Sequence, residues 1–423
     1  MRVQSRVVRY EGREQSPQHL PRTVWLLIAA RAVNRLGAFS LSFFTVLMTT
    51  AFGASAATAG IVSAAFGVAT IPSRLAGGRM ADRIGRRRTL VLGLVGCAVA
   101  QAGIAAAGNL ATAAVCAVLL GLAFELYEPP SQAIIADAVG TEHRVRAYSL
   151  LNAALAVAGM GAGLLAAGLG RWDLRWLFVA DAATCLLCAL VMRLALPDDR
   201  PSRAPEKTGP ATTGPATSNR PSPGRISPWR DRALLTLLAS GTFFALAYLL
   251  VMAMLPLTLE RRGLQPADAG LLLTVSAVTV VAGQPALRRG PLAALAPRTA
   301  FTCGYLLLAI GLVGYAAADS LPSFALATVV WSLGDLLVMG RFMATAADLA
   351  PQGATGRYLA VYGTSWGVAS VAAPLLGTQL LQHTNTTTLW LTTATLCLVL
   401  AALQPTASRL GAFGTPPPAT TRV

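Results

Sequence analysis

Apolar runs of about 20 residues dominate the chain, and this is the length that a helix needs to cross the hydrocarbon core of a bilayer. Only 12% of the residues are charged, whereas about a quarter are charged in an average soluble domain. The chain therefore lacks the polar surface of a soluble enzyme, and we expect an all-α polytopic membrane protein with twelve transmembrane helices. The expected spans are 24–51, 57–76, 89–108, 111–136, 148–169, 175–195, 233–257, 269–287, 299–317, 323–347, 358–381 and 387–403.

The twelve runs fall into two sets of six, separated by a segment rich in Pro, Ser, Thr, Gly and Arg that cannot bury a core. We expect a cytoplasmic N-terminal segment (1–23), a six-helix bundle (24–196), a disordered cytoplasmic linker (197–232), a second six-helix bundle (233–403) and a cytoplasmic tail (404–423). A shift of 211 residues places Ala133, Ala136, Asp137 and Arg146 on Ala344, Ala347, Asp348 and Arg357. Such a six-plus-six parallel repeat is a known transporter architecture, with the substrate site at mid-membrane between the halves.

The formal net charge of +16 is divided unequally between the two sides of the predicted bundle. With the N-terminus in the cytoplasm, 27 of the 34 Lys and Arg residues fall on the cytoplasmic side. The other seven are Arg171, Arg175, Arg261 and Arg262 in opposite loops and Arg31, Arg35 and Arg341 inside spans. Because cytoplasmic loops are enriched in Lys and Arg, we expect both termini in the cytoplasm and a multi-pass protein of the plasma membrane. The basic charge then needs no nucleic-acid partner.

Neither the cysteines nor the histidines form a pattern typical of metal or redox chemistry. All six cysteines lie within apolar runs, and His19, His143 and His383 lie outside the spans. Cys185 and Cys188 have CxxC spacing but no second pair or histidine nearby, which favours apolar packing. We therefore expect no metal, no cofactor and no enzymatic activity.

The loop between spans two and three interleaves glycine, aspartate and arginine in the run Gly78-Arg79-Met80-Ala81-Asp82-Arg83-Ile84-Gly85-Arg86-Arg87-Arg88. Gly85 permits a tight turn, and Asp82 can accept charge-assisted hydrogen bonds. This loop resembles the signature of the major facilitator superfamily, and the resemblance covers almost everything from Val24 to Leu403. It implies a transporter fold and a cytoplasmic conformational gate. The implied gate residues are Gly78, Asp82, Arg83, Gly85, Arg86 and, at the end of span four, Asp137.

Span four carries two acids in an apolar helix, and span one carries two bases at matching depth. Acids inside a membrane span are costly, so Glu125 and Glu128 should face a cavity or partners. Counting at about 1.5 Å per residue places both pairs roughly 12–18 Å from the cytoplasmic end. We therefore predict ion pairs of Arg31 with Glu128 and of Arg35 with Glu125, with a kink just after them at Pro129 and Pro130. A static network that only orients the helices remains the alternative.

Several further residues are candidates for the transport path, because the resemblance implies that spans one, four, seven and ten line a central cavity. Asp335 and Arg341 in span ten lie too far apart for an intrahelical pair, so their partners should lie on other helices. Asn34, Tyr127 and Gln132 are candidates for the cavity wall. Gly159 and Gly163 in span five match a helix-packing face, although a glycine-rich stretch at this point is also typical of proton antiporters in the family. Asp181 in span six is interpreted as structural.

The resemblance implies alternating access of a transporter, and we expect proton-coupled efflux of a small organic molecule such as a drug or a secondary metabolite. Glu125, Glu128 and Asp335 are the proton or cation candidates, with Arg31 and Arg35 as counter-ions. One alternative is a proton symporter or facilitator that imports a nutrient, with the arginines binding an anionic substrate. A second alternative is a membrane sensor that keeps the fold but transports nothing. The expected partners are the substrate, protons and the lipid bilayer, with the protein as a monomer.

Overall fold

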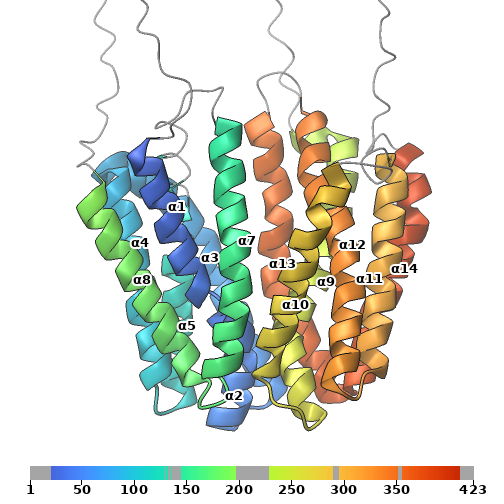
Figure 1. Ribbon diagram of the computed structural model, residues 1–423, viewed down its shortest axis with the longest axis horizontal. Coiled ribbons are helices and arrows are strands. Elements are labelled where there is room, and N and C mark those ends of the chain that lie inside the picture. The colour runs from blue at the N-terminus through green and yellow to red at the C-terminus, as the bar shows by residue number, and fades with distance from the viewer. Residues whose placement is uncertain are drawn as a thin grey trace, which may run out of the picture.

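The computed structural model describes residues 21–196 apart from 129, 132–133 and 135–143, and residues 228–409 apart from 289–294 and 351–354. Within these residues every regular element is a helix (Figure 1). Nine of the described helices are long and apolar enough to cross a membrane. The predicted all-α polytopic fold is confirmed.

The helices of the N-terminal half are α1 (Arg22–Gly37), η1 (Ser40–Phe43), α2 (Phe44–Phe52), α3 (Ala56–Ile84), α4 (Arg86–Ala106), α5 (Leu110–Phe124), α7 (Arg144–Leu169) and α8 (Arg175–Ala195). Those of the C-terminal half are η2 (Pro228–Arg230), α9 (Arg232–Arg261), α10 (Asp268–Arg288), α11 (Pro297–Ala317), α12 (Leu321–Asp348), α13 (Thr355–His383) and α14 (Thr386–Arg409). Most of the predicted linker, 197–227, lies outside the described residues. Several helix boundaries differ from the expected spans, and the largest extensions are those of α3 to Ile84 and of α14 to Arg409.

We call the end of the bundle where α1 begins and α14 ends the terminal end. The first span is not one helix, since α1 stops at Gly37 and the chain continues through the short η1 before α2. A Cβ at Gly37 would lie 2.6 Å from the Cα of Asp181, so α1 and α8 pack with their backbones in close approach. The Ser40 hydroxyl, in the break, donates a hydrogen bond of 2.6 Å to the Asp181 carboxylate.

Span four is also interrupted, one turn before the place that the prolines predicted. The helix α5 ends at Phe124, residues 125–127 form a turn, and helical structure resumes at Glu128. The Glu125 backbone N–H donates to the Ser73 hydroxyl of α3 at 3.1 Å instead of continuing the helical ladder. A Cβ at Gly77 of α3 would lie 2.8 Å from the Leu126 carbonyl oxygen, so neighbouring backbone packs tightly against the turn. The break is therefore set by packing against α3.

The two halves meet mainly through two helix pairs, α7 with α10 and α3 with α13, and α9 makes a smaller contact with η1 and α2. In the first pair, which we call the α7–α10 seam, a Cβ on Gly270 would lie 2.4 Å from the Gly163 carbonyl oxygen. The Thr274 hydroxyl of α10 also contacts the Met160 carbonyl oxygen of α7 at 3.2 Å. The Arg171 guanidinium lies 2.7 Å from the Asp268 carboxylate beside this seam. All these contacts lie toward the end opposite the termini.

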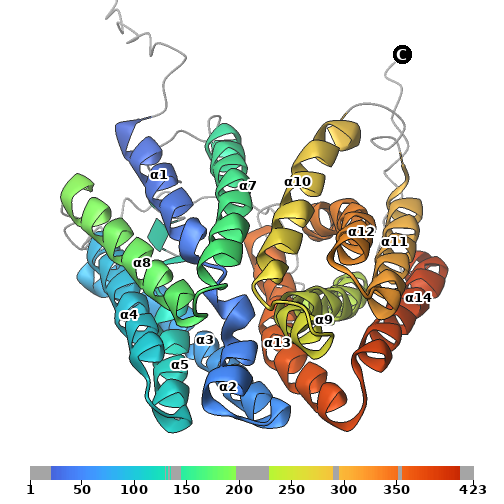
Figure 2. The same cartoon turned by 60° about the horizontal axis from the view of Figure 1, so that its bottom comes forward.

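The second pair repeats this arrangement. The Ala57 backbone N–H at the start of α3 donates to the Gln382 side chain near the end of α13 at 2.8 Å. A Cβ on Gly60 would lie 1.8 Å from the Thr378 hydroxyl oxygen, whereas a Cβ on Gly367, nearer the terminal end of α13, would meet nothing within 4 Å. Figure 2 shows α7 and α10 adjacent at one end and diverging toward the other. The halves are thus closed at the opposite end and separate toward the terminal end.

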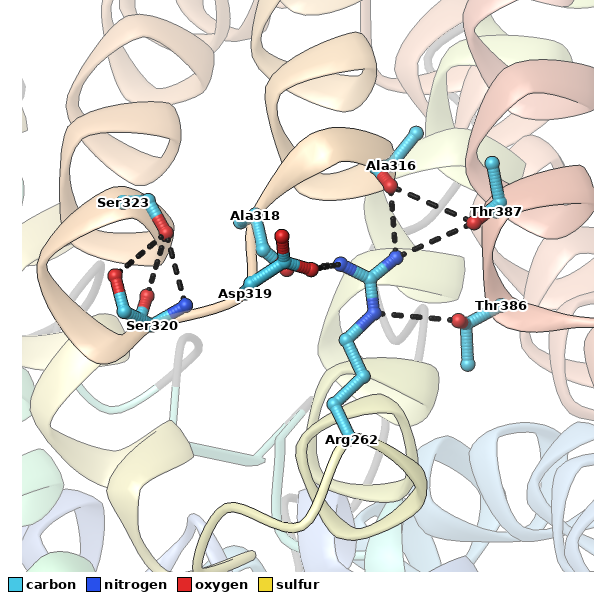
Figure 3. A network of polar contacts seen from close by, with 8 residues as sticks. All are labelled: Arg262, Ala316, Ala318, Asp319, Ser320, Ser323, Thr386 and Thr387. Carbon is cyan, nitrogen blue, oxygen red and sulfur yellow. Dashed lines mark hydrogen bonds and ion pairs between the residues drawn. The ribbon is translucent and has the colours of Figure 1, made fainter.

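Arg262 contacts three segments of the C-terminal half at the end opposite the termini. Arg262 follows α9, and its guanidinium donates to the carbonyl oxygens of Ala316, at 2.8 Å, and of Ala318 (Figure 3). Its Nε donates to the Thr386 hydroxyl at 3.3 Å, and Asp319 lies 3.7 Å from Nη1. The ends of α9 and α11 and the start of α14 are therefore held by one side chain, which favours motion of this half as a unit.

Replacing Arg262 by Gln should lower the free energy of unfolding by about 2 kcal/mol, because charge-assisted bonds to carbonyl oxygens are lost in a side chain that is only 12% exposed. Arg261 is the matched control, since it is exposed and donates one hydrogen bond, to the Leu381 carbonyl oxygen at 2.5 Å. We expect a smaller loss for Arg261→Gln. Thermal unfolding of the purified variants in detergent measures both, and equal losses would contradict the role of Arg262.

Candidate functional site

The centre of the N-terminal half holds an ion pair between the first and fourth spans. Arg31 Nη2 of α1 lies 2.7 Å from Glu128 Oε2, with side-chain exposures of 14% and 28%. The Arg31 guanidinium also lies over the Tyr127 ring, 5.1 Å from its centroid, while its Nη1 has no hydrogen-bond partner in the part of the chain that the structure describes. The predicted pairing of Arg31 with Glu128 is therefore present. The break before Glu128 allows this carboxylate to approach α1.

The second predicted pair, Arg35 with Glu125, is wrong. Glu125 Oε2 lies 3.5 Å from Arg74 Nε of α3, and the Arg74 side chain is 56% exposed. The prediction assumed that Glu125 and Glu128 share one helical face, but the turn at 125–127 rotates Glu125 toward α3. The sequence did not indicate Arg74 as a partner of Glu125, although Arg74 falls within the expected span 57–76 and lies inside the observed α3.

Arg35 is exposed and faces the space between the halves. Its guanidinium lies 5.9 Å from the centroid of the Phe39 ring. The Tyr248 hydroxyl of α9, in the other half, lies within electrostatic range of Arg35. Among the residues that the structure describes, no ion pair includes Arg35. This side chain is thus a cation presented across the interface of the halves.

Asp335 of α12 is the corresponding acid in the C-terminal half. Its side chain is 7% exposed, and its Oδ1 has no hydrogen-bond partner among the residues that the structure describes. Tyr248 lies within electrostatic range of Asp335 as well as of Arg35. The Tyr248 ring packs 5.6 Å from the Trp331 ring and 5.5 Å from the Trp366 ring, measured between centroids. Asp335, which has no counter-ion in the described part of the chain, thus lies near the aromatic rings of Tyr248, Trp331 and Trp366.

The remaining candidates fall in different places. Arg341 donates from Nη1 to the Leu337 carbonyl oxygen of its own helix at 2.9 Å. Asn34, expected in the cavity wall, is 7% exposed and donates to Cys185 Sγ of α8 at 3.1 Å, so it packs inside the N-terminal half. Gln132 lies outside the described residues. Tyr127 lies beside Arg31, as its position next to the glutamates suggested.

The implied gate is described only in part. Gly85 joins α3 to α4 with φ of +93°, a conformation that glycine adopts easily, so the expected tight turn is present. Arg83 is exposed in the last turn of α3, and Arg86 begins α4. Asp137, the Asp82 side chain and the surroundings of Gly78 lie outside what the structure describes. The gate therefore stays a prediction.

Of the two glycines expected on a packing face of α7, only Gly163 makes a close contact. A Cβ at Gly163 would lie 2.2 Å from the Thr274 hydroxyl oxygen, whereas a Cβ at Gly159 would meet nothing within 4 Å. Gly163 therefore belongs to the α7–α10 seam between the halves. Its partner Gly270 and the neighbouring pair of Arg171 with Asp268 were not anticipated, because nothing in the sequence marks which spans touch across the halves.

Asp181 lies in a separate polar cluster inside the N-terminal half. It is 3% exposed, and the Ser40 hydroxyl that contacts it also lies 3.2 Å from Gln101 Oε1 of α4. Cys185 Sγ lies 3.7 Å from the other carboxylate oxygen. This cluster ties α4 and α8 to the break in the first span, in agreement with a structural interpretation.

The site as a whole combines the pair of Arg31 with Glu128 and, without an ion pair in the described part of the chain, Arg35 and Asp335. These groups lie in two halves whose helices diverge toward the terminal end (Figure 2). Such groups can bind charged parts of a small molecule, and a carboxylate in this setting can gain or lose a proton as its surroundings change. Two halves closed at one end suit alternating exposure of such a site.

Comparisons with known proteins agree with this architecture. The sequence profile of the Major Facilitator Superfamily matches residues 27–289 and 237–421. The uncharacterized MFS-type transporter YqjV of Bacillus subtilis (strain 168) is 24% identical over 362 residues, which cover 84% of this chain and 85% of that protein. The multidrug resistance protein MdtH of Cronobacter sakazakii is 26% identical over 285 residues, 67% of each chain.

Solved transporter structures share the fold. The peptide transporter POT in complex with sulfate superposes with a TM-score of 0.72 at 18% identity, covering 92% of this chain and 96% of the other. A bacterial homolog of the human lysosomal transporter Spinster, in an inward-facing and occupied conformation, gives 0.68 at 15% identity over 93% and 98% of the two chains. The family profile extends over both halves and the relatives are transporters rather than enzymes, so this multi-pass membrane protein belongs to the major facilitator superfamily.

Proposed function

We propose that this chain exports small amphipathic organic molecules in exchange for protons, from a plasma membrane in which both termini are cytoplasmic. The observation that carries the proposal is Asp335, a nearly buried carboxylate in a membrane span whose Oδ1 has no hydrogen-bond partner within the described ranges. An ionised carboxylate there is costly, so protonation and release of the proton can be coupled to the exposure of the site. Similarity to a multidrug resistance protein supports export, and the basic residues near the terminal end support the orientation.

The pair of Arg31 with Glu128 supports the same mechanism. Its carboxylate is neutralised when the halves separate toward the terminal end. A shift of α1 against span four within the N-terminal half, during alternating access, would free Glu128 to take up a proton. Glu125, held by the more exposed Arg74, is a second candidate.

Transport of the amphipathic dye rhodamine B into proteoliposomes tests the proposal. With an acidic lumen, protons leave as the dye enters, so we expect an antiporter to take up dye faster than without the gradient. In Asp335→Asn the gradient should no longer accelerate uptake, while exchange of dye for dye continues, because a neutral amide carries no exchangeable proton. Asp173→Asn, in an exposed loop, is the control that should retain the gradient dependence.

Each contrary result has a distinct meaning. Faster uptake with an alkaline lumen would overturn export in favour of symport. Uptake by the wild-type protein that is indifferent to the gradient would overturn proton coupling, and flux equal to that of protein-free vesicles would overturn transport of such a dye.

A further inference from the structure

Two side chains of opposite charge lie at the same depth in opposite halves. Counting at about 1.5 Å per residue, Arg35 lies roughly 20 Å from the start of α1 at Arg22, and Asp335 lies roughly 20 Å from the end of α12 at Asp348. Both starting points are at the terminal end of the bundle. A molecule held between the halves at this depth can therefore contact one charge from each half.

The other ionisable side chains at this level already have partners within the N-terminal half, and Asp181 among them accepts a hydrogen bond from the Ser40 hydroxyl. Arg31 is held by Glu128, and Glu125 by Arg74. In the described part of the chain, neither Arg35 nor Asp335 belongs to an ion pair. Asp335 Oδ1 also lacks a hydrogen-bond partner while the residue is 7% exposed. A buried acceptor without a donor is unfavourable, and a ligand that donates to it relieves this penalty.

The two charges face the same space. The Tyr248 hydroxyl lies within electrostatic range of both Arg35 and Asp335, although Tyr248 and Arg35 belong to different halves. Trp331 precedes Asp335 by one helical turn and packs against Tyr248, which places Asp335 on the same side of α12 as this ring. Tyr248 thus lies near both charges.

An apolar wall completes the site. Tyr248 and Trp366 are half-buried, and their rings meet edge to face with centroids 5.5 Å apart. Aromatic faces pack against apolar rings and attract cations, so this wall suits a ligand whose ammonium group is attached to an apolar or aromatic body.

We propose that the preferred substrate is an amphipathic zwitterion, whose cationic group binds Asp335, whose anionic group binds Arg35 and whose apolar part packs against Tyr248 and Trp366. This inference rests on the proposed transport function and names its substrate class. A compound with only a positive charge would be attracted by Asp335 but repelled by Arg35, and a compound with only a negative charge would be attracted by Arg35 but repelled by Asp335. A compound must therefore carry both charges to make both favourable contacts.

Binding of three matched compounds to the purified protein in detergent tests the proposal without any proton gradient. Phenylalanine carries both charges, phenethylamine only the cation and phenylpropionate only the anion. Ligand-induced thermal stabilisation gives an apparent Kd for each. We expect phenylalanine to bind about tenfold tighter than either analogue, because each analogue loses one charge-assisted contact.

Two neutral variants assign the contacts. In Arg35→Gln, the affinity for phenylalanine should fall to that for phenethylamine, while the affinity for phenethylamine itself should not fall. In Asp335→Asn, the affinity for phenylalanine should fall to that for phenylpropionate, while the affinity for phenylpropionate itself should not fall. Arg298→Gln and Asp173→Asn, both at exposed positions outside the site, should leave all three affinities unchanged.

Three results would overturn the proposal. One is equal binding of the three compounds to the wild-type protein. Another is a loss of affinity for all three in both variants. The third concerns the stability of the ligand-free protein: it falls in each single variant and recovers in the double variant, while the relative affinities for the three compounds stay unchanged. This result would mean that Arg35 and Asp335 pair with each other rather than with a ligand. Because no flux is measured, these outcomes are independent of whether transport is proton-coupled.

Discussion

Glu128→Gln should lower the free energy of unfolding by about 2–4 kcal/mol, because it leaves the Arg31 guanidinium, 14% exposed and already without a partner at Nη1, as an uncompensated charge inside the membrane. The value lies below that for a fully buried pair because the Glu128 side chain is 28% exposed. Arg31→Gln should be comparably destabilising, and the double variant should recover most of the loss because no unpaired charge remains.

Glu125→Gln provides the matched control in the neighbouring turn. Its partner Arg74 is 56% exposed and 3.5 Å away, so we expect a loss below about 1 kcal/mol. Thermal unfolding of the four variants and the wild-type protein in detergent closes a double-mutant cycle for Arg31 and Glu128. Additive losses for the two single variants would show that the pair contributes no interaction energy.

Gly270→Ala should stop transport by preventing closure at the end opposite the termini. The added Cβ would lie 2.4 Å from the Gly163 carbonyl oxygen and 2.6 Å from the Ala167 nitrogen, and both are backbone atoms that move only with the whole of α7. Overpacking of this kind costs about 1–3 kcal/mol, which lowers the population of the described conformation relative to the alternative by a factor of about 5 to 160. The halves should then favour separation at the α7–α10 seam.

Gly159→Ala on the same helix is the control, because its Cβ would meet nothing within 4 Å. Rhodamine B flux in proteoliposomes measures the effect on transport. Electron-spin distances between labels at Arg79 and Arg298, two exposed residues near the terminal end, measure the conformation. We expect a shorter distance in Gly270→Ala only, and undiminished flux in this variant would mean that the seam need not close during transport.

The sequence predicted quantities that depend on position along a helix. Span number follows from the count of apolar runs, and depth follows from the constant rise per residue, so Arg31 and Glu128 were matched before any contact was known. The two-half organisation likewise came from the spacing of the runs around the polar segment.

Quantities that depend on rotation about a helix were not accessible in this way. Arg35 and Glu125 match in depth as well as Arg31 and Glu128 do, yet Glu125 binds Arg74 instead. The i, i+3 relation of the two glutamates holds only in an unbroken helix, and the Ser73 hydroxyl and the backbone at Gly77 impose a turn between them. The prolines indicated a weak point but not its position.

The amino-acid sequence by itself thus determined that the chain crosses the membrane about twelve times in two halves and at which depth each charge lies, because hydrophobicity and helical rise are properties of single segments. Only the tertiary structure decided which charged side chains form ion pairs, which face the other half without one among the described residues, and which glycines make the close backbone contacts of the α7–α10 seam. These depend on helix rotation and breaks, which are fixed by close backbone contacts between segments distant in the chain.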